Sequence, residues 1–220
     1  MKRNSALIAG ATGLVGSYCL QHLIDTYEEI IVLSRRPLKD MPANVRVEVI
    51  DFDRLSGYKD LFRVDHVYCC LGTTLKKAGS RSAFRKVDFE YPFQMAQLSA
   101  DNDVHQFLFI SSLGANANSR VFYNQVKGET EDAISRVNIK SIHIFRPSLL
   151  LGERQEFRLG ESIGEILMKA ISPVLFGNMR SYRPIHAETV ARAMVNAPAG
   201  EIPGIHIYSS DQICQLAEKE

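Results

Sequence analysis

The sequence contains no tryptophan, few cysteines and almost no net charge. Its 26 lysine and arginine residues are balanced by 25 aspartate and glutamate residues, which leaves a formal net charge of +1. Because such a chain has no general positive field toward phosphate backbones or anionic lipid, we expect no nucleic-acid partner. No uninterrupted apolar run reaches the ~18 residues that a transmembrane helix needs, so we also expect no membrane span.

The cysteines and histidines are too few and too scattered to indicate a metal site. The cysteines include one adjacent pair and no Cys-x-x-Cys motif, which argues against a zinc site and a disulfide framework and favours a reducing, cytoplasmic location. Of the six histidines, His66, His143 and His206 fall in expected strands and are interpreted as hydrogen-bonded core or edge residues. The residues concerned are Cys19, Cys69, Cys70, Cys214, His66, His143 and His206.

What the sequence does contain is a regular alternation of short apolar runs with helical stretches, typical of a parallel sheet wound with helices on both faces. Several runs, such as 30–33, are apolar at consecutive positions, which indicates strands covered on both sides. We therefore predict an α/β fold with a doubly wound parallel sheet of the Rossmann type. The expected strands are 5–10, 30–34, 45–50, 65–71, 104–111, 141–145 and 204–209.

The expected helices lie between these strands, and the last third of the chain differs from the rest. Pro92 should kink or interrupt the third helix. After Pro147, frequent glycine and proline predict loops and short helices laid over the sheet edge. We expect one domain over 1–220, with residues 148–203 forming a small C-terminal substrate cap. The expected helices are 14–26, 54–62, 82–100 and 122–137.

A glycine-rich turn follows the first expected strand. Gly10, Gly13 and Gly16 are each three residues apart and lead directly into a helical pattern. At such a turn, glycines permit a tight backbone and the close approach of a pyrophosphate, whose charge meets exposed amides at the helix start. The turn thus predicts dinucleotide binding. The cofactor contacts expected here are Gly10, Thr12, Gly13, Leu14, Val15 and Gly16.

The end of the second strand indicates which dinucleotide is bound. An NAD site normally has an acidic residue here, ~20 residues beyond the glycines, to hold the adenosine ribose. This sequence instead has Ser34, Arg35 and Arg36, whose guanidinium groups match the oxygens of a 2′-phosphate. We predict NADP(H) as the cofactor, with NAD less favoured.

A further cofactor contact is expected directly after the third strand. The carboxylate of Asp51 can accept a hydrogen bond from the adenine amino group, and Phe52 would border the ring. Asp53 is interpreted as the N-cap of the helix that begins at Arg54.

A hydroxyl, a phenol and an ammonium are expected to converge near the carboxyl end of the sheet. Tyr123 and Lys127 are four residues apart and share one helix face, and Ser111 and Ser112 end the preceding strand. A phenol with an ordinary pKa of ~10 needs a nearby positive charge to act near neutrality, which a lysine and an oxidised nicotinamide would supply. The set is typical of proton-coupled hydride transfer.

The sequence resembles an atypical short-chain dehydrogenase/reductase, and within that superfamily the Tat-interacting protein oxidoreductase family and its bacterial relatives. The resemblance covers nearly the whole chain. The segments that carry it are 69–74 (CCLGTT), 77–80 (KAGS), 123–131 and 145–156, which runs from FRP to ERQE.

This resemblance implies roles for individual residues. Tyr123 would be the acid/base, Lys127 the ribose-binding lysine and Ser112 the catalytic serine, with Ser111 the alternative by one residue of register. Asp88 stands where relatives often carry asparagine, which puts the usual proton-relay water in doubt. His186 is a candidate substrate contact. On the cofactor side, Leu71, Gly72 and Thr73 would line the adenosine and ribose, and Pro147 and Ser148 would border the nicotinamide.

Three functions follow from these observations. The first is an NADP-dependent oxidoreductase acting on a carbonyl or alcohol. The second is a regulatory protein that senses NADP(H) and binds a protein partner with little turnover. The third is a nucleotide-sugar epimerase or dehydratase, which ranks lowest because the chain has only about 70 residues after Pro147 for a substrate cap. The substrate and the oligomeric state stay open, with a homodimer as one alternative.

Overall fold

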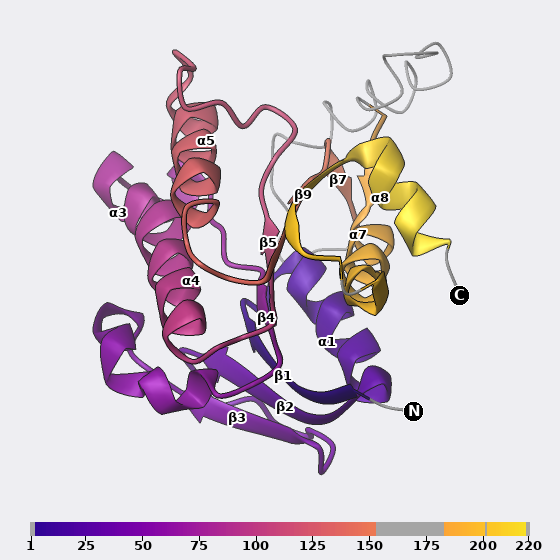
Figure 1. The fold of residues 1–220 in the computed structure, drawn as a ribbon. Helices are drawn as coiled ribbons and strands as arrows, with labels where there is room; N and C mark the ends of the chain where they lie inside the picture. Colours follow the sequence, from indigo (N-terminus) through magenta and orange to yellow (C-terminus); the bar gives the residue numbers. More distant parts are fainter. Residues whose placement is uncertain (1–2, 153–182, 201, 219–220) are drawn as a thin grey trace.

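The computed structural model describes residues 3–152, 183–200 and 202–218, which are built around a sheet of seven parallel strands (Figure 1). Its strand order is β3-β2-β1-β4-β5-β6-β9. The chain therefore adds β2 and β3 on one side of β1, and then β4, β5, β6 and β9 on the other side. β7 (Leu150–Leu151) and β8 (Ile185–His186) form a separate short parallel pair. The seven strands are β1 (Arg3–Ala9), β2 (Tyr27–Ser34), β3 (Val45–Val49), β4 (His66–Cys69), β5 (Gln106–Ile110), β6 (Ser141–Arg146) and β9 (Gly204–Ser209).

Helices cover both faces of this sheet, with α1 and α7 on one side and α4 and α5 on the other (Figure 1). In β1, Ala6 and Ile8 pack in the core beneath α1 and α7, whereas Leu7 and Ala9 pack beneath η1 and α4. The doubly wound fold is therefore confirmed. The helices are α1 (Leu14–Thr26), η1 (Phe52–Phe62), α2 (Leu75–Ala78), α3 (Arg81–Arg85), η2 (Lys86–Glu90), α4 (Tyr91–Asp101), α5 (Phe122–Ile134), α7 (Ala187–Asn196), η5 (Ala197–Gly200) and α8 (Ser210–Ala217).

The helix predicted over 82–100 is divided into α3, the π-helical turn η2 and α4. Pro92 lies in the first turn of α4, so the expected interruption is confirmed. Because proline has no amide hydrogen, the carbonyl of Asp88 loses its helical donor. The hydroxyl of Thr130, on α5, donates to that carbonyl at 2.9 Å. Pro92 thus shapes the backbone at Asp88 and connects it to α5.

Other boundaries differ from the predictions. The helix after β3 is the 3-10 helix η1, which begins two residues earlier than expected and has non-helical backbone angles at Arg54 and Tyr58. β2 begins at Tyr27, three residues earlier than expected, because Tyr27 is buried and bonded to other core residues.

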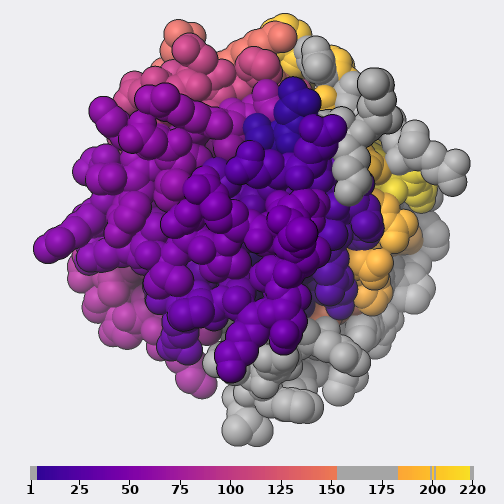
Figure 2. Space-filling model, turned by 90° about the horizontal axis from the view of Figure 1, so that it is seen from below, coloured from indigo at the N-terminus to yellow at the C-terminus, as the bar shows by residue number. Residues whose placement is uncertain are grey.

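The last third of the chain contains the predicted strand β9 and short helices, of which α7 is part of the core. β9 joins the sheet beside β6, and α7 packs along α1 through Val190, Ala191 and Met194. In the view from below, the N-terminal part of the chain fills most of the face and α7 (orange) borders it (Figure 2). Residues 153–182 of the predicted cap lie outside the described residues.

The strand histidines are hydrogen-bonded, as predicted for His66 and His143. His66 Nδ1 lies 2.6 Å from the hydroxyl of Tyr27, and His143 Nδ1 lies 2.9 Å from that of Tyr208. His206, on the edge strand, lies 2.9 Å from the carbonyl oxygen of Ile202. Among the residues that the structure describes, no group of three or more histidine, cysteine, aspartate or glutamate residues could hold a metal ion. In the same residues, no helix is long and apolar enough to cross a membrane.

Candidate functional site

The glycine turn brings the ends of β1 and β4 and the start of α1 into very close contact. Gly10 has φ +88°, and a Cβ there would lie 2.4 Å from the carbonyl oxygen of Cys70. A Cβ at Gly16 would lie 2.1 Å from the carbonyl oxygen of Gly10. The amide of Gly13 donates to that same oxygen at 2.9 Å. Larger side chains cannot occupy the first and third glycine positions without moving the backbone.

The first turn of α1 can accept an anion. Gly13 is the N-cap and provides no side-chain bond, and the first turn contains no acidic residue. The first amides of a helix have no partner within it, and they lie at the positive end of the helix dipole. Thr12 and Gly13 are exposed, whereas the side chain of Val15 is buried in the core and leaves only its backbone for a ligand. These residues fit the diphosphate of a dinucleotide.

Two guanidinium groups lie exposed at the end of β2. Arg35 and Arg36 follow Ser34, whose hydroxyl accepts a hydrogen bond from the amide of Arg36 at 3.2 Å. Within the described part of the chain neither arginine has an ion-pair partner. Both charges are therefore available to a phosphate.

The segment after β3 corrects one prediction. The N-cap of η1 is Asp51, which accepts from the amide of Asp53 at 3.0 Å, and not Asp53 itself. The carboxylate of Asp53 instead pairs with Lys86 at 2.7 Å and accepts from the hydroxyl of Tyr91. Lys86 is the main reason why the pKa of Asp53 lies below its usual value. The capping role moves because η1 begins two residues earlier than expected.

The ring of Phe52 is buried and packs at 5.5 Å from the ring of Tyr91. The predicted adenine contacts of Asp51 and Phe52 stay predictions.

Beyond β4, the segment expected to line the cofactor runs directly beside the glycine turn. The amide of Cys70 donates to the carbonyl of Ala9 at 2.9 Å, which places Leu71 next to Gly10, with Gly72 and Thr73 following it along the chain. Cys69 is fully buried, and burial raises the pKa of its thiol to about 12. This cysteine packs as a small apolar residue, as expected, and is not a nucleophile.

The two serines after β5 present hydroxyl groups without partners. The side-chain oxygens of Ser111 and Ser112 are both buried, and neither has a hydrogen-bond partner among the described residues. Buried hydroxyl groups are normally hydrogen-bonded, because an unpaired one costs about 1–3 kcal/mol. Orphaned hydroxyls at the carboxyl end of a central strand are suited to bind a ligand there.

Tyr123 and Lys127 lie in the first half of α5. The ring of Tyr123 is half-buried and lies 5.6 Å from the ring of Phe84 on α3. The side chain of Lys127 is only 3% exposed. Its ammonium donates to the carbonyl of Ile110 at 3.1 Å, at the residue directly before the serine pair. The structure thus joins the lysine and the end of β5, as the sequence predicted.

The segment after β6 closes one side of this region. The carbonyl of Pro147 accepts from the amide of Leu113 at 3.0 Å, which binds it to the loop after the serines. The amide of Ser148 donates to the hydroxyl of Ser210 at 2.7 Å, and the hydroxyl of Ser148 donates to the carbonyl of Arg183. His186 is exposed at the end of β8, at the N-cap position of α7, where its side chain makes no capping bond.

Two buried acidic residues were not assigned a role from the sequence. The carboxylate of Asp88 contacts Lys127, and the carboxylate of Glu131 accepts two bonds at 3.0 Å from Nε of Arg146, directly before Pro147. In the sequence, Pro92 indicates a disturbed helix near Asp88, four residues earlier. It gives no indication that Asp88 pairs with Lys127.

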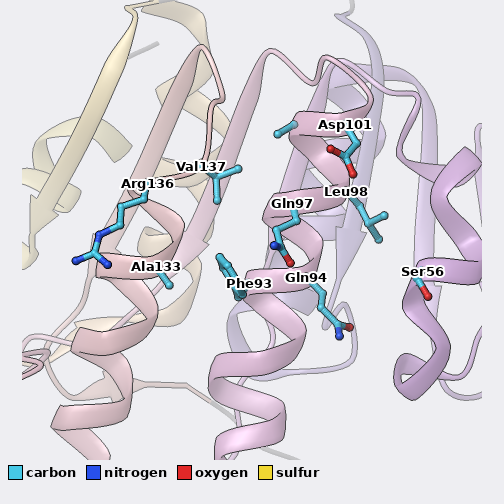
Figure 3. Close-up of a pocket in the computed structure, with 10 residues that line it drawn as sticks. Ser56, Phe93, Gln94, Gln97, Leu98, Asp101, Ala133, Arg136 and Val137 are labelled. Carbon is cyan, nitrogen blue, oxygen red and sulfur yellow. The ribbon is translucent and has the colours of Figure 1, made fainter.

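A groove of about 650 Å³ lies away from these residues, between α4, α5 and η1 (Figure 3). Its walls come from α4, from the end of α5 with the residues directly after it, and from Ser56 of η1, with Leu98 and Val137 among the apolar groups. Tyr123 and Lys127 are on the first turns of α5, so the groove is not part of the candidate site.

Comparison with known proteins gives one family and several relatives. A model described as "NAD dependent epimerase/dehydratase family" matches residues 6–201. Protein HTATIP2 of Rattus norvegicus is 33% identical over 202 residues, which cover 89% of this chain and 81% of that protein. Protein FMP52, mitochondrial, of Eremothecium gossypii is 28% identical over 223 residues, covering 98% of each.

Solved structures of similar fold include nucleotide-sugar enzymes. The UDP-N-acetylglucosamine 4-epimerase of Methanobrevibacter ruminantium M1, in complex with UDP-N-acetylmuramic acid, has a TM-score of 0.70 and 14% identity, covering 95% of this chain and 77% of that one. The Bordetella bronchiseptica enzyme WbmH, in complex with NAD+, has a TM-score of 0.70 and 16% identity, covering 94% and 76%. At these identities the likeness shows the fold alone.

Proposed function

Because the chain belongs to the NAD dependent epimerase/dehydratase family, we propose that it is an NADP-dependent oxidoreductase that transfers hydride between the nicotinamide and a carbonyl or alcohol substrate. The observation that carries this proposal is the convergence at the end of β5. There, a buried lysine contacts the strand end at Ile110, directly before Ser111 and Ser112, whose buried hydroxyls have no partner among the described residues.

The residues present fit a dinucleotide. Gly10, Gly13 and Gly16 would hold its diphosphate against the first amides of α1. Arg35 and Arg36, which have no carboxylate partner in the described ranges, would bind a 2′-phosphate and so favour NADP(H) over NAD(H). When bound, the nicotinamide supplies or accepts the hydride.

The side chains at the end of β5 would handle the substrate oxygen and its proton. The phenol of Tyr123 donates a proton to the carbonyl oxygen in the reducing direction and accepts it in the other. The hydroxyl of Ser112, or of Ser111, donates a hydrogen bond that orients the same oxygen. The ammonium of Lys127, which lies beside the end of β5, would bind the cofactor ribose.

The test is a panel of carbonyl and alcohol substrates with NADPH and NADP, run on the wild type and on Tyr123→Phe. We expect turnover to fall by roughly 10²–10⁴-fold in the variant, the contribution usual for a positioned acid/base, while NADPH affinity stays unchanged. Tight NADPH binding without turnover across the panel would instead favour a cofactor-sensing protein. Epimerisation of a nucleotide sugar without net change in the cofactor would favour the third function.

For location, we propose the cytoplasm, on the basis of the cysteines. The described cysteines are all free thiols, and Cys19 and Cys69 are buried. The Eremothecium gossypii relative is named as mitochondrial. Fractionation of the native cell, with an antibody to this protein, distinguishes the two compartments.

A further inference from the structure

Asp88 is a buried carboxylate that connects three elements of the candidate site. One carboxylate oxygen, Oδ2, accepts from the amide of Thr73 at 2.9 Å, in the loop expected to line the cofactor. The other, Oδ1, lies 3.4 Å from the ammonium of Lys127 on α5. The backbone carbonyl of Asp88 accepts from the hydroxyl of Thr130, also on α5. A single residue in η2 therefore holds the cofactor loop and the helix of Tyr123 at once.

The pair that Asp88 forms with Lys127 is almost completely removed from water. The two side chains are 2% and 3% exposed. Among the described residues, the ammonium also contacts the carbonyl of Ile110 and the ring of Phe109, whose centroid lies 4.8 Å away. A neutral carbonyl and a ring face do not compensate a buried cation in full, so the carboxylate of Asp88 is the contact that balances the charge of this ammonium among the described residues.

We propose that Asp88 is a positioning residue, which fixes the cofactor loop at Thr73 and keeps the ammonium of Lys127 charged and directed toward the end of β5. The inference rests on the proposed function, in which Lys127 binds the cofactor beside the acid/base Tyr123. An asparagine at this position would keep the bond to Thr73 but would not balance the lysine.

Other titratable groups near the pair do not replace Asp88. From β4, Cys69 is buried, and its raised pKa leaves the thiol neutral. From α5, Tyr123 is the only other ionisable side chain between positions 122 and 128. Further along the same helix, Glu129 is bound by Arg85 and Glu131 by Arg146, while Lys86 of η2 is bound by Asp53. Burial raises the pKa of Asp88, and the charge of Lys127 opposes this shift most strongly.

The first experiment measures NADPH affinity against pH for the wild type, Asp88→Asn and Lys127→Met. We expect the wild-type affinity to be flat from pH 7 to 9.5. In Asp88→Asn it should be within about three-fold of wild type at pH 7 and fall by about ten-fold or more by pH 9.5, because an unbalanced buried lysine loses its proton early. The variant Lys127→Met should bind NADPH more weakly than the wild type at every pH.

The matched control is Glu129→Gln, which removes a carboxylate from the same helix outside the site and should keep the flat profile. A flat profile for Asp88→Asn at wild-type affinity would overturn the inference and leave the proposed function intact. Failure of the wild type to bind NADPH at any pH would overturn both.

A second measurement needs no cofactor. Lys127→Met leaves the carboxylate of Asp88 buried without its cation, so this variant should unfold at a lower denaturant concentration than the wild type. The double variant Asp88→Asn/Lys127→Met should recover part of that loss, because no buried charge remains. Additive losses from the two substitutions would contradict the pairing.

Discussion

At the scale of single residues, the candidate site combines side chains that are already bound with side chains that are free. Asp88 and Lys127 have defined partners, so they set the shape of the site before any ligand arrives. Ser111 and Ser112 have buried hydroxyls without partners among the described residues, and these are the groups that a substrate or cofactor can satisfy. Pre-formed supports beside open hydrogen-bonding groups are what a binding site requires.

The first prediction concerns the two arginines after β2. In Arg35→Ala/Arg36→Ala, we expect NADPH affinity to fall by about ten-fold or more, because two charge-assisted contacts to the 2′-phosphate are lost. NADH affinity should change by less than about three-fold, since NADH lacks that phosphate. Titration of both cofactors by fluorescence checks this, and an unchanged NADPH affinity would retire the NADP assignment.

At the scale of elements, the glycine turn depends on how closely α1 approaches the end of β1. The spacing of three between the glycines places Gly16 on the first turn of α1, facing the carbonyl of Gly10. If residue 16 carried a side chain, α1 could not start this close to the end of β1.

The second prediction tests that approach. In Gly16→Ala, the new Cβ would lie 2.1 Å from the carbonyl oxygen of Gly10, so the turn must open. We expect a loss of about 1–3 kcal/mol in the free energy of unfolding and at least ten-fold weaker NADPH binding. Gly57→Ala is the matched control, since nothing lies within 4 Å of a Cβ there. Equal NADPH affinities for the two variants would argue against a cofactor at this turn.

At the scale of the whole molecule, hydrogen bonds between buried polar side chains connect three neighbouring strands of the sheet. His143 on β6 lies 3.1 Å from Oε1 of Gln106 on β5 and 2.9 Å from the hydroxyl of Tyr208 on β9. Because an amide oxygen only accepts, Nε2 of His143 donates to Gln106, and Nδ1 can accept from Tyr208. The neutral imidazole therefore satisfies both neighbours and joins three strands.

The third prediction is a loss of stability in acid. Burial is the main reason why the pKa of His143 falls to about 4 from an ordinary 6.5, with His206 and His66 adding to the shift. Between these values the unfolded chain binds more protons than the folded one. The stability from this group is therefore present above pH 6.5 and is lost as the pH falls to about 4, by roughly 3 kcal/mol in all.

Denaturant unfolding at several pH values checks this loss. The slope of unfolding free energy against pH should become shallower in His143→Gln between pH 6.5 and 4. The exposed residue His105 provides a control, since His105→Gln should keep the wild-type slope. Identical slopes in the wild type and His143→Gln would exclude His143 as a source of acid sensitivity.

Much of the fold follows from local sequence patterns. The bounds predicted for α1 match the structure, because Gly13 opens the helix and the apolar spacing continues to Thr26. Six of the seven strands expected from apolar runs begin within two residues of their predicted starts; β2 starts three residues early. These features depend on residues a few positions apart, which the sequence displays directly.

Tertiary contacts decided what local patterns could not. Asp51 rather than Asp53 caps η1, and Asp53 pairs with Lys86, 33 positions further along the chain. Asp88 and Lys127 are 39 positions apart, so their pairing has no signature in spacing or propensity. The sequence by itself determined a doubly wound sheet with a glycine turn and a family of dinucleotide-binding proteins. Tertiary packing decided which charged side chains pair in the interior. A buried ion needs a partner of opposite charge, and only the folded chain brings Asp88 and Lys127 together.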